Sequence, residues 1–254
     1  MMKKYKLGIA LGGGGSRGFA HLGILKALFE RDIVPDIISG TSAGSIVGVF
    51  IADKKTPDEI LNILKEKGFF KYTSFNIPKT GLVGLEGLEK QLHEDLSTDD
   101  LEKLAIPMIA AVTNLNKGKT EYFSKGAPEK IIQASSAIPV LFSPVEINGQ
   151  LYADGGLLDN VPVDILRDQC EKVIGIDISP VTQMDEIENL FHIALRTFQL
   201  SVSASSHNLK DRCDLLIAPE ACSEYDLLNA KQADELFEMG YEYAKNMDLS
   251  AITG

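Results

Sequence analysis

Ser42 lies at the centre of a Gly-x-Ser-x-Gly stretch that runs from Gly40 to Gly44. Apolar residues before the stretch predict a buried strand, and residues 43–52 predict a buried helix. In a nucleophile elbow, the two glycines allow a tight strand–turn–helix that exposes the serine hydroxyl and directs the next N–H toward a reacting carbonyl. The pattern also occurs by chance in a chain with 22 glycines, so Ser42 is either a nucleophile or a turn residue.

A serine nucleophile needs a neighbouring base, and the histidines offer a poor one. His21, His93 and His192 lie in predicted helices, where a packed or solvated side chain is the ordinary interpretation. His207, near the end of a long predicted helix over 186–210, is the best remaining triad candidate. The chain therefore contains a good serine and no convincing histidine.

Asp154 offers a different base. It is followed by Gly155 and Gly156 at the end of a predicted hairpin. An aspartate before two glycines is usually a turn residue, because its carboxylate accepts nearby backbone N–H groups. A carboxylate held beside the Ser42 hydroxyl can also take its proton directly, which would give a dyad in place of a triad.

A run of glycines ends the first predicted strand. Gly13, Gly15 and Gly18 fit the G-x-G-x-x-G pattern of dinucleotide sites. However, the second predicted strand does not end in an acidic residue, and no Gly-Lys-Ser/Thr follows for a phosphate loop. Consecutive glycines before a helix can also form a nest of N–H groups for negative charge. Such a nest would suit an oxyanion as well as a phosphate.

Together these motifs resemble the patatin family of lipid acyl hydrolases. Gly-Gly-Gly-x-Arg-Gly (13–18), Gly-x-Ser-x-Gly (40–44) and Asp-Gly-Gly (154–156) appear in the family's order, and residues 134–145 resemble its proline-containing segment. The resemblance spans about residues 6 to 165. The length of the chain is most similar to that of small stand-alone bacterial members.

The resemblance implies a Ser-Asp dyad in which Ser42 is the acyl-forming nucleophile and Asp154 is its base. It implies that the glycine loop supplies an oxyanion hole, with contributions expected from Gly13, Gly14, Gly15, Arg17 and Gly18. The implied reaction is the hydrolysis of acyl esters of phospholipids, lysophospholipids or other lipids through an acyl-enzyme. That chemistry requires no metal and no organic cofactor.

Predicted strands and helices alternate along the chain without long polar linkers, repeats or low-complexity segments. The alternation predicts one α/β domain over residues 1–254, with a mostly parallel central sheet and helices on both faces. This three-layer α/β/α arrangement is also what the patatin resemblance implies.

The composition limits the classes of partner. A net charge of −11 and a pI of about 4.9 argue against nucleic acid and against electrostatic docking on anionic lipid, while weak hydrophobic contact with a membrane surface stays compatible. Three cysteines without metal-ligand spacing favour free thiols in a reducing compartment. The sequence lacks a run of about 18 apolar residues and a signal-peptide core, so a cytoplasmic location, peripheral to the membrane at most, is expected.

Several segments allow two interpretations. The aromatic-rich residues 68–85 could form a lid or belong to the core, whereas the apolar face of 187–202 is expected to pack in the core. Asp159 and Asn160 are expected to cap the helix that follows them. Arg17 could bind a phosphate head group, but a structural ion pair is the preferred interpretation.

Two other functions fit the same motifs. One is a catalytically silent protein that keeps the fold as a regulatory or binding module. The other is a nucleotide-binding protein that uses the glycine loop. The presence of Ser42, Asp154 and the glycine loop together favours the hydrolase.

Overall fold

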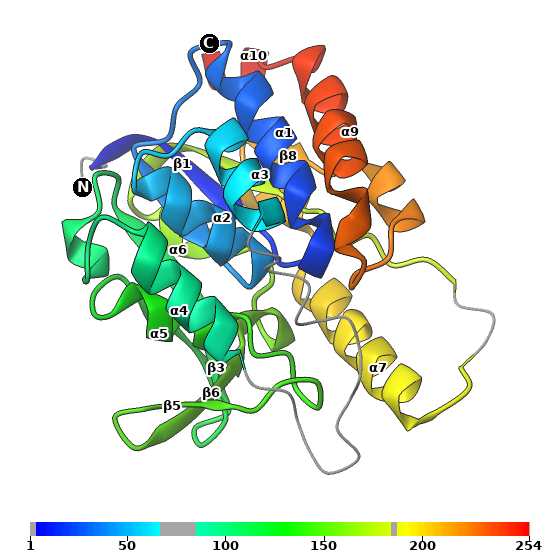
Figure 1. Ribbon diagram of the computed structural model, residues 1–254. Coiled ribbons are helices and arrows are strands. Elements are labelled where there is room, and N and C mark those ends of the chain that lie inside the picture. Colours follow the sequence, from blue (N-terminus) through cyan, green and yellow to red (C-terminus); the bar gives the residue numbers. More distant parts are fainter. Residues whose placement is uncertain (1–3, 67–84, 184–186, 254) are drawn as a thin grey trace.

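The computed structural model describes residues 4–66, 85–183 and 187–253. A sheet that is eight-stranded among these residues forms the centre of the molecule (Figure 1). Hydrogen-bonded neighbours follow the path β5-β6-β3-β2-β1-β7-β8, in which β6 and β2 pair with one edge of β3, and β4 pairs with the opposite edge. The parallel strands are β1 (Tyr5–Leu11), β2 (Ile37–Gly40), β3 (Met108–Asn114), β7 (Cys170–Ile176) and β8 (Leu215–Ile217). The antiparallel strands are β4 (Lys119–Phe123), β5 (Val145–Ile147) and β6 (Gln150–Asp154).

Helices cover both faces of this sheet, as the alternation of elements predicts. Their bounds are α1 (Gly18–Phe29), α2 (Ala43–Ala52), α3 (Pro57–Glu66), α4 (Glu86–Asp95), α5 (Pro128–Ser135), α6 (Asp164–Arg167), α7 (Leu190–Ser205), α8 (Leu209–Arg212), α9 (Ala233–Lys245) and α10 (Ser250–Thr253). Figure 1 shows α1, α2, α3 and α9 grouped on one side of the sheet. The predicted three-layer α/β/α fold with a mostly parallel sheet is confirmed.

The alternation of side chains along β1 explains the two helical layers. Ile9 points to the face where α1, α2, α3 and α9 pack, and Ala10 points to the opposite face, where Leu166 of α6 and Leu209 of α8 are buried. Successive side chains of a strand point to opposite faces, so a strand covered on both sides must be apolar throughout. The burial of residues 7–11 in β1 follows from this position in the middle of the sheet.

The end of the chain differs from its prediction. The single long helix expected over 186–210 is divided, because Asn208 adopts a left-handed conformation (φ 56°) between α7 and α8. The expected core face of 187–202 is confirmed only in part: Phe191, Leu195 and Phe198 pack partly buried against a core cluster and Val202 is buried, whereas Ile187 and Leu190 are exposed. The segment 68–85, predicted as lid or core, lies outside the described residues except for Leu85. Within the described parts of the chain, no helix is long and apolar enough to cross a membrane.

The contact between α1 and α9 depends on glycine, and this gives a stability prediction. A Cβ at Gly23 of α1 would lie 1.9 Å from the carbonyl oxygen of Phe237, and one at Gly240 of α9 would lie 2.3 Å from that of Ala20. Gly23→Ala must therefore push the two helices apart, at a cost of about 3 kcal/mol in the free energy of unfolding. Urea denaturation measures this cost.

Gly118→Ala is the matched control. Gly118 has φ 64°, and a Cβ at this position would have no neighbouring atom within 4 Å, so its replacement adds only backbone strain of about 1 kcal/mol. A Gly23→Ala protein that is as stable as the Gly118→Ala protein would contradict the close approach of the two helices.

Candidate active site

The turn that carries Ser42 joins the end of β2 to the start of α2. Ser42 has φ 52°, which is unfavourable for a residue with a side chain and marks a strained corner. Its N–H donates to Ser135 Oγ at 3.0 Å, and its carbonyl accepts from Ser45 Oγ at 2.7 Å. A Cβ at Gly44 would lie 2.1 Å from the carbonyl oxygen of Leu11. The turn can therefore lie this close to β1 only if residue 44 is glycine. These contacts hold the strained strand–turn–helix geometry that a nucleophile elbow would require.

Strand register brings Asp154 to this corner. Gly40 of β2 pairs with Ala110 of β3, and Asp154 of β6 pairs with Val112, two residues further along β3. Because β4 occupies the other edge of β3 over the same residues, β2 and β6 must lie end to end on one edge. The carboxyl end of β6 therefore meets the carboxyl end of β2, directly before Ser42.

The Asp154 carboxyl group is fully buried, and this sets its protonation. Burial raises its pKa to about 7. Hydrogen bonds from the Ser42 hydroxyl and the Gly156 N–H act in the opposite direction and lower the pKa, but their effect is smaller. Oδ1 accepts the Gly156 N–H at 2.8 Å. Oδ2 forms no hydrogen bond of standard geometry with the described residues, so this oxygen is free to receive a proton.

The glycine loop lies beside the same corner, and most of its N–H groups are already occupied. Gly13 N–H donates to Asn160 Oδ1 at 3.1 Å, Arg17 N–H donates to the Gly14 carbonyl at 3.2 Å, and Gly18 N–H donates to the Gly15 carbonyl. Among the described residues, the N–H groups of Gly14 and Gly15 have no protein acceptor. Of the five residues expected to form the oxyanion hole, two thus have a backbone donor available.

The Arg17 side chain links the glycine loop to two later segments of the chain. Its Nε donates to the Tyr225 carbonyl at 2.9 Å and its Nη1 donates to the Pro180 carbonyl at 3.3 Å. Desolvation lowers the pKa of this buried guanidinium, while nearby Cys222, Asp226 and Asp177 act in the opposite direction. These contacts favour the structural interpretation of Arg17 over head-group binding.

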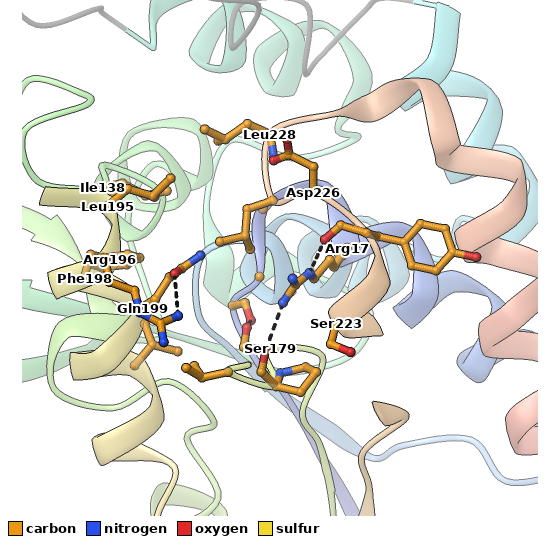
Figure 2. Close-up of a pocket in the computed structure, with 18 of the residues that line it drawn as sticks. Arg17, Ile138, Ser179, Leu195, Arg196, Phe198, Gln199, Ser223, Asp226 and Leu228 are labelled. Atoms are coloured by element: carbon orange, nitrogen blue, oxygen red, sulfur yellow. Dashed lines mark hydrogen bonds between the residues drawn. The ribbon is translucent and has the colours of Figure 1, made fainter. Parts of the chain in front are cut away.

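A cavity of about 890 Å³ opens beside these residues, and its lining includes Gly14, Gly15, Ser42 and Asp154. Most of its apolar lining belongs to α7, which also contributes the polar side chains of His192, Arg196 and Gln199. The apolar lining side chains include Ile138, Phe191, Leu195, Phe198, Val202 and Leu228. Figure 2 shows Ile138, Leu195 and Phe198 on one side and Arg17, Ser179 and Asp226 on the other. Ser42 and Asp154 therefore line a pocket in which apolar side chains, mainly of α7, adjoin polar ones.

The structure assigns other places to the histidines. His21 is buried and its Nε2 bonds the Gly12 carbonyl at 2.7 Å, and burial lowers the pKa of His21 to about 4. His192 lines the cavity, whereas His93 and His207 are exposed. Within the described part of the chain, no histidine forms a hydrogen bond to Ser42 or Asp154.

The expected helix caps at Asp159 and Asn160 are wrong. The N-cap of α6 is Val163, without a side-chain bond. Asp159 Oδ2 instead accepts the Tyr122 hydroxyl at 2.7 Å, and Asn160 bonds the glycine loop. Sequence reasoning missed Asn160 because a polar pair before a helix looks like a cap. It also missed Ser135, although this serine lies in the segment that resembles the family.

The described residues contain no group of three or more His, Cys, Asp or Glu side chains arranged to hold a metal ion. The polar groups around Ser42 are a carboxyl group, backbone N–H groups and amides. They can move a proton and stabilise a negative oxygen, which are the two tasks that acyl transfer requires.

Comparison with known proteins identifies the family of this chain. The sequence profile of the family described as patatin-like phospholipase matches residues 9–167. An uncharacterized NTE family protein of Mycobacterium bovis is 36% identical over 62% of this chain and 44% of its own length. Lysophospholipase NTE1 of Saccharomyces cerevisiae is 25% identical over 94% of this chain and 16% of its own length. The chain thus spans less than half of either protein.

One viral protein and one solved structure match over more of their length. The uncharacterized protein R571 of Acanthamoeba polyphaga mimivirus is 29% identical over 96% of this chain and 94% of its own length. The crystal structure of VipD from Legionella pneumophila has a TM-score of 0.54 at 18% identity, over 95% of this chain and 66% of that one, which shows likeness of fold alone. The profile match covers more than half of the residues and includes the elbow, the glycine loop and the Asp-Gly-Gly turn, and the chain therefore belongs to the patatin-like phospholipase family.

Proposed function

We propose that this protein is a serine acyl hydrolase that cleaves carboxylic esters of lipids through Ser42 and Asp154. One observation carries the proposal: the strained Ser42 and the buried Asp154 carboxyl group, whose Oδ2 has no partner among the described residues, line the same cavity. A pKa of about 7 suits a base that works near neutral pH.

In the first half of the reaction, Ser42 Oγ attacks the ester carbonyl carbon while its proton passes to Asp154 Oδ2. The carbonyl oxygen becomes an oxyanion, which the N–H groups of Gly14 and Gly15 are available to stabilise. The tetrahedral intermediate then collapses, the carbon–oxygen bond to the leaving alcohol breaks, and Asp154 returns the proton to that alcohol. An acyl group remains on Ser42.

In the second half, water replaces the alcohol. Asp154 takes a proton from the water as its oxygen attacks the acyl carbon, and the oxyanion forms at the same place. The intermediate then collapses, the bond between the acyl carbon and Ser42 Oγ breaks, and Asp154 gives its proton to Oγ, which releases the carboxylic acid and restores the Ser42 hydroxyl. The sum is hydrolysis of one ester bond, with every proton transfer made through the same carboxyl group.

The apolar wall of the cavity supports a lipid substrate. An acyl chain can lie along Leu195, Phe198 and Ile138, with the leaving alcohol toward the polar side. The name of the yeast relative, a lysophospholipase, is consistent with this substrate class. Arg17 contributes little to head-group recognition under this proposal, because its guanidinium already binds two carbonyl groups.

Labelling with a fluorophosphonate probe tests the nucleophile. In wild type, we expect the Ser42 oxygen to displace fluoride from the probe and form a bond to its phosphorus atom. Mass spectrometry of the peptides then locates the labelled residue. Ser42→Ala should take no label, and Asp154→Asn should label at least about 100-fold more slowly, because a general base contributes that much or more.

The labelling experiment also separates the other two functions. A folded wild type that takes no label would contradict an activated serine and leave the silent binding module. Nucleotide affinity that survives in Ser42→Ala would favour a nucleotide site at the glycine loop.

The buried base predicts the pH dependence of activity. Asp154 must be deprotonated to act, and burial raises its pKa to about 7, so activity should be present above pH 7 and lost below it. For a soluble short-chain ester, kcat/KM should fall roughly tenfold per pH unit and be about 100-fold lower at pH 5 than above pH 8. A flat profile between pH 5 and pH 8 would contradict the role of this carboxyl group.

We also propose that the outer face of α7 contacts the lipid surface from which substrate is taken. Leu190 is 77% exposed, and Ile193 and Leu200 are about half exposed, on the helix whose other face lines the cavity. The ionisable side chains of α7 are His192 and Arg196, so this helix carries no acidic group in a protein of net charge −11. An apolar, acid-free face suits a lipid surface better than the rest of this acidic protein does.

Replacing Leu190 and Ile193 together by serine tests the α7 contact. Hydrolysis of ester carried in neutral phosphatidylcholine vesicles should fall by about tenfold or more, because burying one leucine contributes about 1.5 kcal/mol or more to binding. Hydrolysis of a soluble short-chain ester should not change. Val34→Ser, at a residue 49% exposed between α1 and β2, is the matched control and should leave both rates unchanged. Equal loss on both substrates would contradict a surface role.

A further inference from the structure

We infer that Asn160 is a positioning residue that holds the glycine loop in its oxyanion-binding geometry and couples it to the turn that carries Asp154. The inference rests on the proposed acyl hydrolase function. It concerns a residue outside the three sequence motifs, and its role follows from contacts on both sides of its side chain.

The first contact is with the glycine loop. Gly13 N–H is shared between the carbonyl oxygen of Asn160, at 3.3 Å, and its Oδ1, at 3.1 Å. Asn160 therefore fixes the peptide plane that joins Gly12 to Gly13, one residue before the peptide that carries the Gly14 N–H. On the other side of the loop, the Ser179 hydroxyl donates to the Gly13 carbonyl. With both polar groups of Gly13 occupied, the following N–H groups of Gly14 and Gly15 are the ones left for substrate.

The second contact is with the turn after Asp154. A Cβ at Gly156 would lie 3.1 Å from Asn160 Oδ1 and 3.1 Å from Asp154 Oδ1, and a Cβ at Gly13 would lie 2.7 Å from Asn160 Oδ1. The amide thus fills the narrow space between the two glycine-containing segments. A shift of Asn160 would move the oxyanion donors relative to the base.

The amide group is an unusual choice for simple space filling. Asn160 is fully buried, and its Nδ2 has no hydrogen-bond partner among the described residues. A buried donor without an acceptor is unfavourable, and an apolar side chain of similar size would avoid that cost. In return, Asn160 Oδ1 accepts the Gly13 N–H, and an apolar side chain could not make this hydrogen bond.

Asn160→Ala tests this role through two readouts. The first is amide hydrogen exchange of a peptide covering residues 12–18, which reports the loop without any substrate. Exchange should speed up in Asn160→Ala and stay close to wild type in Asn160→Asp, because the aspartate keeps an acceptor oxygen in the same place. Unchanged exchange in the alanine variant would overturn the inference, whatever the activity.

The second readout is oxyanion stabilisation. A trifluoromethyl ketone is attacked by Ser42 Oγ, its carbonyl oxygen becomes an oxyanion, and the serine proton passes to Asp154. In Asn160→Ala, kcat for a soluble short-chain ester should fall about 10- to 100-fold with little change in KM, since a misplacement near 1 Å costs about that much. Affinity for the ketone should fall by the same factor. A loss confined to KM would overturn the inference.

Asn114→Ala is the matched control. Asn114 is also a fully buried asparagine whose Oδ1 accepts a backbone N–H, that of Lys117 at 3.0 Å, but it lies on β3 away from the glycine loop. This variant should lose stability without the change in loop exchange or ketone affinity. If it changes both as much as Asn160→Ala does, the effect is general destabilisation and the inference fails. Absence of Ser42-dependent activity in wild type would instead overturn the proposed function, and the exchange readout would still decide whether Asn160 holds the loop.

Discussion

The arrangement of β2 and β6 on one edge of β3 is the constraint on which the rest of the site depends. On this edge, the parallel strand β2 ends at Gly40 and the antiparallel strand β6 ends at Asp154. Their carboxyl ends face each other, so the turn after each strand can share one small volume. In a wholly parallel sheet, the ends of neighbouring strands lie side by side, and the connection after each strand leads away to a helix. The mixed sheet is therefore what brings Ser42 and Asp154 close enough for the proposed dyad.

This arrangement is costly to the folded state. Ser42 is held at φ 52°, and Asp154 is buried where its charged form is disfavoured. The surrounding structure keeps both in place: Ser42 donates its N–H to Ser135 and accepts from Ser45, and the Asp154 carboxyl group accepts the Gly156 N–H. The apolar layers on both faces of the sheet stabilise the fold and so offset the cost of this local strain.

The residues beyond the family match complete the cavity. Ser16 N–H donates to the Leu227 carbonyl at 2.8 Å, Arg17 donates to the Tyr225 carbonyl, and Ser179 donates to Gly13, so two segments from the C-terminal part of the chain hold the glycine loop. Helix α7, from the same part of the chain, supplies the apolar wall. The family motifs thus provide the groups proposed to react, and the later residues shape the space around them. Differences in substrate preference between relatives are expected to arise in these later segments.

The sequence by itself determined the motifs and the elements that carry them. Local spacing encodes the strand–turn–helix around Ser42, the hairpin that ends at Asp154 and the alternation that predicts three layers, because each depends on neighbouring residues alone. Only the tertiary structure decided that β6 lies end to end with β2, which N–H groups of the glycine loop are free, and that Asn160 holds this loop in place of capping a helix. It also decided that the apolar residues of α7 divide between a cavity wall and an exposed face. These features depend on strand register and on contacts between residues more than 100 positions apart, such as Gly13 and Asn160, and a local pattern carries no information about either.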